Sequence, residues 1–412
     1  MGDDRSRKLT PRSLLVLVAL SLAACGGEAI VSVPASIRDS AGITIVDSRG
    51  SAPSTWRFPE APQVEIGVLQ GDPAYQLSGV VGAARLRDGR IAVADRVTKQ
   101  IRFFGPDGSH LQTVGGPGQG PGEFRLLFSL DRLPGDTIVG MDWPVGSASW
   151  FDGSGRFLRT DQIGPFWPGL AGHLLPDASL LVDVYPLRSY GNELEGWAAR
   201  GEENTFRPTG HLVRVSRDGS RHDTLFPIVG EEWFKNGKLR EDFAMRPAPF
   251  AVTTAVAWND TWIFVGETAG SEVRAYRYDG SLERLIRWRE TRVPVTVADR
   301  DSVAEAVVAE IRQPSRQPYF EKWLDLVAFP AEKPAFHSLM TDEAGRLWVR
   351  TWAEAGAARD RWLVFGSDGA LAAAVEVPAG LTLLEIGEDA ALALWKDPLE
   401  VEYLRLYEIE RG

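Results

Sequence analysis

The chain has 412 residues, of which 44% are hydrophobic and 25% charged, with 42 glycines and 26 prolines. This is the composition of a folded globular protein, and it excludes a disordered chain. The formal net charge of -11 argues against a nucleic-acid partner, because binding to phosphates depends on Lys and Arg. The single cysteine, Cys25, excludes an internal disulfide framework and a metal site made of several thiolates.

The first residues have the pattern of an export signal. Basic residues up to Arg12 precede the apolar run from Ser13 to Leu22, and two alanines precede Cys25. The apolar run is too short for a transmembrane helix, which needs about 20 such residues. The block from Leu22 to Cys25 resembles the lipobox of bacterial lipoproteins. That resemblance implies cleavage before Cys25 and acylation of its thiol, for example with palmitate.

We therefore expect a signal peptide over residues 1–24, a linker over 25–40 and an exported domain over 41–412, held to a membrane through Cys25. Gly26 stands where lipoproteins retained in the inner membrane carry Asp, and the resemblance thus implies the outer membrane. The alternative is a structural Cys25 in a protein core, which its small and polar neighbours do not favour.

The exported domain contains a first set of short β-branched and aromatic runs, each pair joined by a tight turn. Turns of this kind between apolar runs predict β-hairpins. Six such hairpins are expected, with turns at Asp88-Gly89, Gly135-Asp136, Asp177, Asn259-Asp260, Gly345 and Asp389.

A second set of turns follows all but the last of these hairpins. Each has an aromatic or aliphatic residue four positions before a glycine: Phe104 to Gly108, Phe151 to Gly155, Val215 to Gly219, Tyr276 to Gly280, and Phe365 to Gly369. Two hairpins per unit make four antiparallel strands, and six units with a period of about forty residues predict an all-β, six-bladed β-propeller. The sixth unit lacks its last strand, so we expect segments 42–46 and 64–67 to close the ring.

One unit also carries a family resemblance. The segment from Ile91 to Phe124, with its Gly-rich stretch and Glu123-Phe124, resembles one repeat of the NHL-type six-bladed propellers. The resemblance extends over nearly all of the mature chain and suggests bacterial propeller lipoproteins, mostly of unassigned function. It implies a fold rather than an activity.

The long connections fall on one face of the predicted propeller. They cover about residues 185–210, 229–250, 289–335 and 115–125. Binding residues are usually carried by loops of this kind on a rigid scaffold, so we expect the ligand or partner on this face. Between blades four and five, residues of about 294–330 predict a small helical insertion, with helices over 297–312 and 319–327 and an N-cap at Thr296. It is either a lid, with Arg312, Tyr319 and Trp323 reaching the ligand, or a flap over blade edges.

Charged and aromatic residues recur near the ends of the second strands, on that same face. Indole rings can stack on sugar or aromatic ligands while carboxylates and arginines bind hydroxyl groups or charges. The alternative is that the aspartates cap turns and the tryptophans pack between blades. The candidate ligand-binding residues are Asp95, Arg96, Asp142, Trp143, Tyr185, Glu267, Arg312, Trp352, Trp395 and Asp397.

Signatures of catalysis are sparse. The five histidines are dispersed, and no GxSxG nucleophile elbow is present. We therefore expect a lipid-anchored protein that binds a protein, peptide or glycan without covalent chemistry, and no cofactor is firmly indicated. The alternative is a Ca²⁺-dependent hydrolase or lyase at the mouth of the channel, with Asp95, Asp142 and Glu267 as oxygen ligands. Sugar-lactone hydrolases, which resemble NHL propellers, use such a calcium site, but their ligand pattern does not map onto this chain.

Overall fold

The computed structural model describes residues 35–142, 146–163, 172–184, 205–236, 244–309, 311, 315 and 317–412. The expected signal peptide, Cys25 and most of the expected linker lie outside these residues. The described chain is all-β with two α-helices, which confirms the predicted class. None of its helices is long and apolar enough to cross a membrane.

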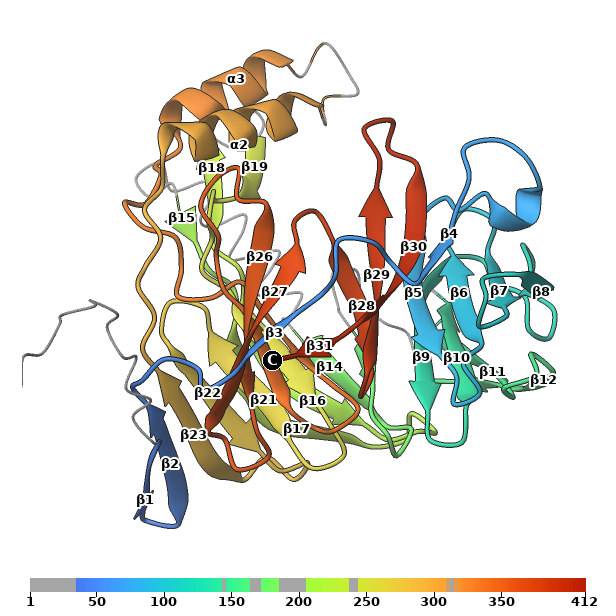
Figure 1. Ribbon diagram of the computed structural model, residues 1–412, viewed down its shortest axis with the longest axis horizontal. Helices are drawn as coiled ribbons and strands as arrows, with labels where there is room; N and C mark the ends of the chain where they lie inside the picture. Colours follow the sequence, from blue (N-terminus) through green and yellow to red (C-terminus); the bar gives the residue numbers. More distant parts are fainter. Residues whose placement is uncertain are drawn as a thin grey trace, which may run out of the picture. The chain divides into compact units, whose positions relative to one another are not determined.

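The first three predicted units form successive antiparallel sheets of four strands (Figure 1). Sheet 1 consists of β5 (Val80–Arg85), β6 (Ile91–Asp95), β7 (Gln100–Phe104) and β8 (His110–Gly115). Sheet 2 consists of β9 (Leu127–Leu133), β10 (Thr137–Asp142), β11 (Ser147–Phe151) and β12 (Phe157–Gln162). Sheet 3 consists of β13 (Gly172–Leu174), β14 (Leu180–Val184), β16 (Thr209–Val215) and β17 (His222–Val229).

The next three units form sheets that also take in strands from the two ends of the chain. Sheet 4 consists of β20 (Thr254–Trp258), β21 (Ile263–Glu267), β22 (Glu272–Tyr276) and β23 (Leu282–Trp288), with β2 (Ile43–Ser48) and β1 (Ser36–Ser40) outside them. Sheet 5 consists of β24 (Ser338–Thr341), β25 (Leu347–Arg350), β26 (Arg359–Phe365) and β27 (Leu371–Pro378), with β3 (Thr55–Arg57) and β31 (Glu410–Arg411). Sheet 6 consists of β28 (Thr382–Ile386), β29 (Ala390–Lys396), β30 (Glu402–Glu408) and β4 (Val64–Ile66).

The turns predicted from the sequence explain the local structure. In the second hairpin of sheet 1, Gly108 has a φ of 81°, which a residue with a Cβ rarely adopts. The Asp107 carboxylate accepts the backbone N–H of Ser109 at 3.0 Å, and the strand register shifts by one residue beside this turn. The same register shift beside the turn occurs in sheets 2, 4 and 5, whereas in sheet 3 the register shifts inside β16, between Leu212 and Val213. All eleven predicted hairpins are therefore confirmed as antiparallel strand pairs.

The N-terminal segment adds strands to three sheets in turn. Strand β2 runs parallel to β23, β3 runs parallel to β27, and β4 pairs antiparallel with β30. The last pairing supplies the strand that the sixth unit lacks. Of the two segments expected to close the ring, 64–67 therefore does so, whereas 42–46 joins sheet 4. Strand β1 occupies the end of the segment expected to be a linker and pairs with β2 along its whole length.

Six hydrophobic clusters hold the sheets together. Each cluster contains residues of two successive sheets, and one joins sheet 6 back to sheet 1. Between sheets 1 and 2, for example, Ile101 and Phe103 pack with Ile138 and Phe151, and all four are buried. Successive sheets that share a core in this manner form a β-propeller-like fold.

A smaller unit, which we call the cap, combines three separate insertions. A three-stranded sheet of β15 (Thr205–Phe206), β18 (Trp233–Asn236) and β19 (Ala244–Pro247) lies beside α2 (Val297–Ala309) and α3 (Gln317–Leu326) (Figure 1). The buried Trp323 of α3 donates its indole N–H to the carbonyl oxygen of Phe234 at 3.1 Å. The cap sheet was not predicted from the sequence. One 3₁₀ turn (Pro73–Tyr75) lies elsewhere, before β5.

The start of α2 is fixed by polar contacts. The backbone N–H of Asp299 donates to the Thr296 hydroxyl at 3.2 Å, so Thr296 is the N-cap that the sequence predicts. Asp299 also forms an ion pair of 2.7 Å with Lys333, and both side chains are buried. This pair fastens α2 to the segment that leads into sheet 5. Helix α2 begins at the predicted residue, whereas Arg312 lies outside the described residues.

Candidate functional site

The first strands of all six sheets enclose a cavity of about 970 Å³, which we call the central cavity. One apolar side chain from each sheet lines it: Ala83, Leu130, Leu174, Val256, Met340 and Leu384. The turns that join first and second strands also border it, including Arg87, Asn259 and Gly345. We call this the hairpin end of the propeller-like fold. The carboxyl ends of the second strands define the opposite, insertion end.

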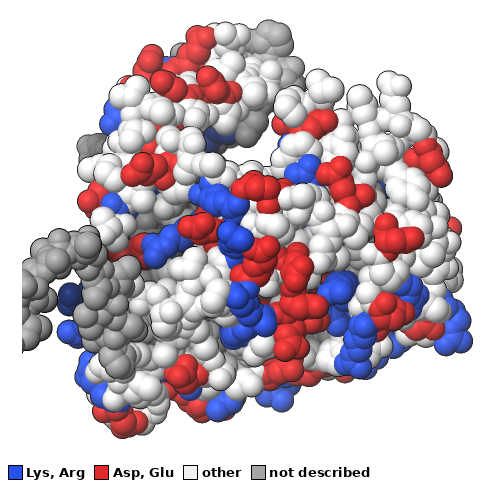
Figure 2. All heavy atoms as spheres, viewed as in Figure 1, with Lys and Arg blue, Asp and Glu red and all other residues white. Residues whose placement is uncertain are grey.

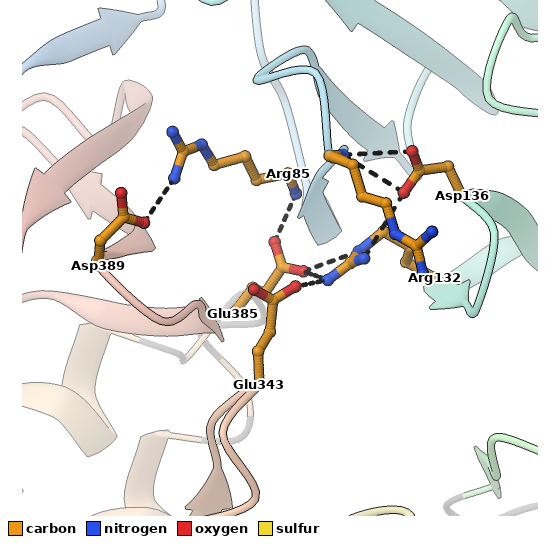
Figure 3. A network of polar contacts seen from close by, with 7 residues as sticks. Arg85, Arg132, Asp136, Glu343, Glu385 and Asp389 are labelled. Atoms are coloured by element: carbon orange, nitrogen blue, oxygen red, sulfur yellow. Dashed lines mark hydrogen bonds and ion pairs between the residues drawn. The ribbon is translucent and has the colours of Figure 1, made fainter.

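A network of charged side chains crosses the central cavity at the hairpin end (Figure 3). Arg132 of β9 donates to Glu385 Oε1 from Nε at 3.1 Å and from Nη2 at 3.0 Å. It also pairs with Glu343, which follows β24, and its Nη1 lies 3.6 Å from Asp136 Oδ1. The other oxygen of Glu385 accepts the backbone N–H of Arg85. The network thus links sheets 1, 2, 5 and 6.

Burial and charge act in opposite directions on this network. Burial raises the pKa of Glu385, and the neighbouring Arg132 guanidinium partly offsets that rise. Burial would lower the pKa of Arg132, but the carboxylates of Glu385 and Glu343 raise it overall. Arg132 is therefore a fixed cation whose charge is already shared by two acids.

Asp131, beside Arg132 on β9, has a different environment. Its only hydrogen bond among the described residues comes from the Ser129 hydroxyl at 3.4 Å, and it has no ion pair there. The residue is partly buried, and it lines the central cavity. Burial accordingly raises the pKa of Asp131 to about 7. This carboxyl group can gain or lose a proton near neutral pH.

The structure places three predicted aspartates in turns at the insertion end. The buried Asp95 accepts the backbone N–H groups of Ser78, Val97 and Thr98 at 3.0 Å each, and lies 3.4 Å from Arg102 Nη1. Contacts of this kind belong to turn-capping residues, the alternative that the sequence left open.

Asp142 and Asp397 have the same kind of contact. Asp142 accepts the N–H groups of Arg125 and Leu126 at 2.8 and 2.7 Å. Asp397 accepts those of Leu399 and Val401 at 2.8 and 2.9 Å. Asp142 also lines a separate cavity of about 410 Å³, between the Gly-rich segment and β12.

The other predicted residues are dispersed over the insertion end. Arg96 is exposed. Glu267 is also exposed and lies 3.4 Å from Arg207. Trp352 packs against Phe250 and His337, and Trp395 packs against Tyr403 with the Arg405 guanidinium 3.7 Å from its ring centre. Cys25, Trp143, Tyr185 and Arg312 lie outside the described residues.

The proposed calcium ligands do not come together in the structure. Two of them, Asp95 and Asp142, already accept backbone N–H groups, and Glu267 lies beside Arg207. The part of the chain that the structure describes holds no group of three or more acidic, His or Cys side chains able to bind a metal ion. These three residues therefore do not fit a shared Ca²⁺ site.

The sequence analysis missed the residues of the central cavity. Asp131, Arg132 and Glu385 lie in first strands, whereas the predicted residues follow second strands. Charged residues inside otherwise apolar strands could have indicated this site. Such residues are rarely buried without a partner, so their presence in a strand suggests a functional group. On the side drawn in Figure 2, acidic and basic side chains are interspersed, and no large patch of one sign identifies a site.

No family model and no curated protein match this chain. Among solved structures, it is similar to regucalcin, a calcium-binding protein from Agrobacterium tumefaciens, with 10% identity over 87% of this chain and 96% of the other, and a TM-score of 0.40. It is also similar to virginiamycin B lyase from Staphylococcus aureus, with 12% identity over 83% of this chain and 98% of the other, and a TM-score of 0.39. A gluconolactonase from Xanthomonas campestris is similar too, with 12% identity over 88% of this chain and 99% of the other, and a TM-score of 0.41. At these low values the activities of the three proteins do not transfer to this chain, and the NHL resemblance stays a prediction.

Proposed function

We propose that this chain is an exported, lipid-anchored β-propeller of six blades that binds a small polar ligand in its central cavity without covalent chemistry. The observation that carries the proposal is the cavity itself. Its volume of about 970 Å³ lies in the range of pockets that bind small molecules, and it combines apolar walls with a few charged groups.

Two further features support the architecture in this proposal. The six hydrophobic clusters connect six sheets in a closed succession, and the two helices of the cap lie between sheets 4 and 5 in the sequence. The lipobox resemblance at Cys25 supports an anchor in the outer membrane. The sequence pattern predicted the ligand site at the insertion end, whereas we assign it to the central cavity at the hairpin end. The insertion end and its cap then offer a separate surface for a protein, peptide or glycan.

A second candidate function is hydrolysis or elimination in the same cavity. It is favoured by one observation, the pKa of about 7 at Asp131, because a carboxyl group in this range can act as a general acid or base at neutral pH. Binding without chemistry is preferred because Arg132, Glu343 and Glu385 are bonded to one another rather than directed at a common point.

The binding proposal can be tested with a cavity-filling variant. Small polar compounds are screened against the full chain by thermal shift, and each compound that stabilises it is retested on Val256→Trp. Val256 lines the cavity, so the indole should occupy ligand space and abolish the stabilisation. Val308→Trp, on an exposed residue of α2, is the matched control and should leave it unchanged. If Val256→Trp does not fold, as judged by circular dichroism, Leu384→Trp replaces it.

Compounds that stabilise the cavity-filling variant as strongly as the original chain would overturn the proposed site. The anchor is tested separately with Cys25→Ser, which should abolish incorporation of labelled palmitate and release the protein from the membrane fraction. Retention of the label in that variant would contradict lipidation at Cys25.

A further inference from the structure

We propose that the ligand of the central cavity is an organic cation, a small molecule with at least one ammonium group, and that the Asp131 carboxylate binds this group. The inference rests on the proposed function and adds the chemical class of the ligand. It follows from the charge balance of the cavity, the position of Asp131 and the character of the cavity walls.

The lining of the cavity has an excess of negative charge. Six acidic and three basic residues line it among those that the structure describes. Arg132 is bonded to Glu343 and Glu385. Arg284 donates to the carbonyl oxygen of Ser367 at 2.5 Å and lies over the Trp262 ring. A ligand with a positive charge would therefore improve the electrostatic balance of the site.

Among the acidic residues of the cavity, Asp131 should form the most favourable ion pair with a bound cation. A carboxylate removed from water without a counter-ion is unstable, and it responds by binding a proton. Burial raises the pKa of Asp131 to about 7, and the Ser129 hydroxyl offsets that rise only in part. An ammonium group would supply the charge and a hydrogen-bond donor together, and it would compete with the proton for the same carboxylate.

The walls of the cavity favour an organic cation over a metal ion. Leu130, Val256 and Met340 provide apolar surface for a hydrocarbon chain, and Trp258 adds an indole. A volume of about 970 Å³ far exceeds that of one hydrated ion. No cluster of three metal-binding side chains occurs in the described ranges.

The pH dependence of binding follows from the groups that face Asp131. Its own strand contributes the Ser129 hydroxyl, and the cavity wall contributes charged groups from the other sheets. These are Arg87 of sheet 1, Arg132 of sheet 2, Asp260 and Arg284 of sheet 4, Asp342 and Glu343 of sheet 5, and Glu385 and Glu388 of sheet 6. Arg346 binds Asp342, and Arg132 binds Glu343 and Glu385. Asp260 and Glu388 are exposed to solvent, so Asp131 is the acid whose proton a cation should displace.

The experiment is isothermal titration calorimetry of the full chain in detergent, with 1,5-diaminopentane and spermidine as probes. With a pKa of about 7 at Asp131, affinity should fall roughly 30-fold between about pH 8 and pH 5.5, because the proton must be displaced. Asp131→Asn should weaken binding at least about tenfold and remove this pH dependence. Asp301→Asn makes the same charge change on an exposed residue of α2 and should alter affinity less than about twofold.

Three results would overturn the inference. The first is absence of binding by both amines at millimolar concentration near pH 8. The second is equal binding of uncharged 1,5-pentanediol, and the third is tighter binding of CaCl₂ than of either amine. If one of these occurs while Val256→Trp still abolishes binding of compounds from the screen, the class of ligand is wrong but the cavity remains the binding site. If Val256→Trp has no effect on any compound, the proposed function itself fails.

Discussion

Acidic side chains occur at both ends of the propeller-like fold, but their environments differ. At the insertion end, Asp95 and Asp142 accept backbone N–H groups at 2.7 to 3.0 Å. At the hairpin end, Asp131 faces the central cavity with a single hydrogen bond of 3.4 Å among the described residues. Asp95 and Asp142 therefore serve the backbone, whereas Asp131 remains available to a ligand.

The difference has a topological cause. Asp95 ends β6, and the backbone N–H groups of the following Val97 and Thr98 donate to it. Asp142 ends β10 and accepts the N–H groups of Arg125 and Leu126, which precede β9. Asp131 lies inside a first strand, which pairs with β10, and no backbone N–H group among the described residues donates to its side chain. Its side chain is not needed by the backbone. A carboxylate at the end of a strand is thus weaker evidence for a ligand site than one in the middle of an inner strand.

The largest effect that tests this comparison is expected for Asp95→Ala. The substitution removes the acceptor of three N–H groups and leaves the Arg102 guanidinium, which is 3% exposed, without its counter-ion. Breaking a buried ion pair should lower the free energy of unfolding by about 3–5 kcal/mol. Urea denaturation of the purified chain measures this change.

Asp397→Ala is the matched control for this experiment, because Asp397 accepts two N–H groups and is only partly buried. It should lower the free energy of unfolding by about 1 kcal/mol. A loss below about 1 kcal/mol for Asp95→Ala would show that this carboxylate is not consumed by the fold, and the comparison would no longer hold.

The second prediction is a gain in the free energy of unfolding rather than a loss. Asp131 has a folded pKa of about 7, against about 3.9 in an unfolded chain, so the folded state binds its proton more tightly. The resulting stability is complete below about pH 4 and is lost as pH rises through about 7. An asparagine at position 131 carries no charge at any pH, so Asp131→Asn avoids the loss of stability that ionisation causes. The substitution should raise the free energy of unfolding of the ligand-free protein by roughly 2–4 kcal/mol near pH 8. Near pH 4 the variant and the original chain should be equally stable.

Thermal unfolding of both chains across this pH range measures the effect. Asp142→Asn, at the insertion end, is the control and should destabilise the chain at every pH tested, because an amide is a weaker acceptor for the two N–H groups. If Asp131→Asn is destabilising near pH 8, the carboxylate has a stabilising partner and is not free for a ligand.

The fold was largely predictable from the sequence because its signals are local. Each hairpin turn involves residues close in sequence, such as Asp107, Gly108 and Ser109, and alternating apolar residues mark the flanking strands. The missing last strand of the sixth unit likewise pointed to closure by the N-terminal region, although the sequence did not distinguish segment 42–46 from segment 64–67. The cap sheet gave no such signal, because β15, β18 and β19 have only two to four residues each.

The site was less predictable because it depends on contacts between distant segments. Arg132 and Glu385 are 253 positions apart in the sequence, and only the packing of the sheets brings them together. The isolation of Asp131 is a property of its surroundings, which no local pattern encodes. The candidates at the strand ends were chosen from a real repeat, but at Asp95, Asp142 and Asp397 that repeat reflects turn formation.

The smallest effect is expected for Glu267→Gln, and it tests the insertion end most directly. Glu267 was predicted as a ligand and a metal-binding residue, yet its side chain is 51% exposed and its ion pair with Arg207 spans 3.4 Å. Exposed pairs contribute about 0–1 kcal/mol to stability, so the free energy of unfolding should change by less than about 0.5 kcal/mol.

Because Glu267 does not line the central cavity, the affinity for 1,5-diaminopentane should change less than about twofold. Denaturation and calorimetry on the same preparation measure both quantities. A large loss of binding with unchanged stability would mean that the ligand is bound at the insertion end, and the roles assigned to the two ends would have to be exchanged.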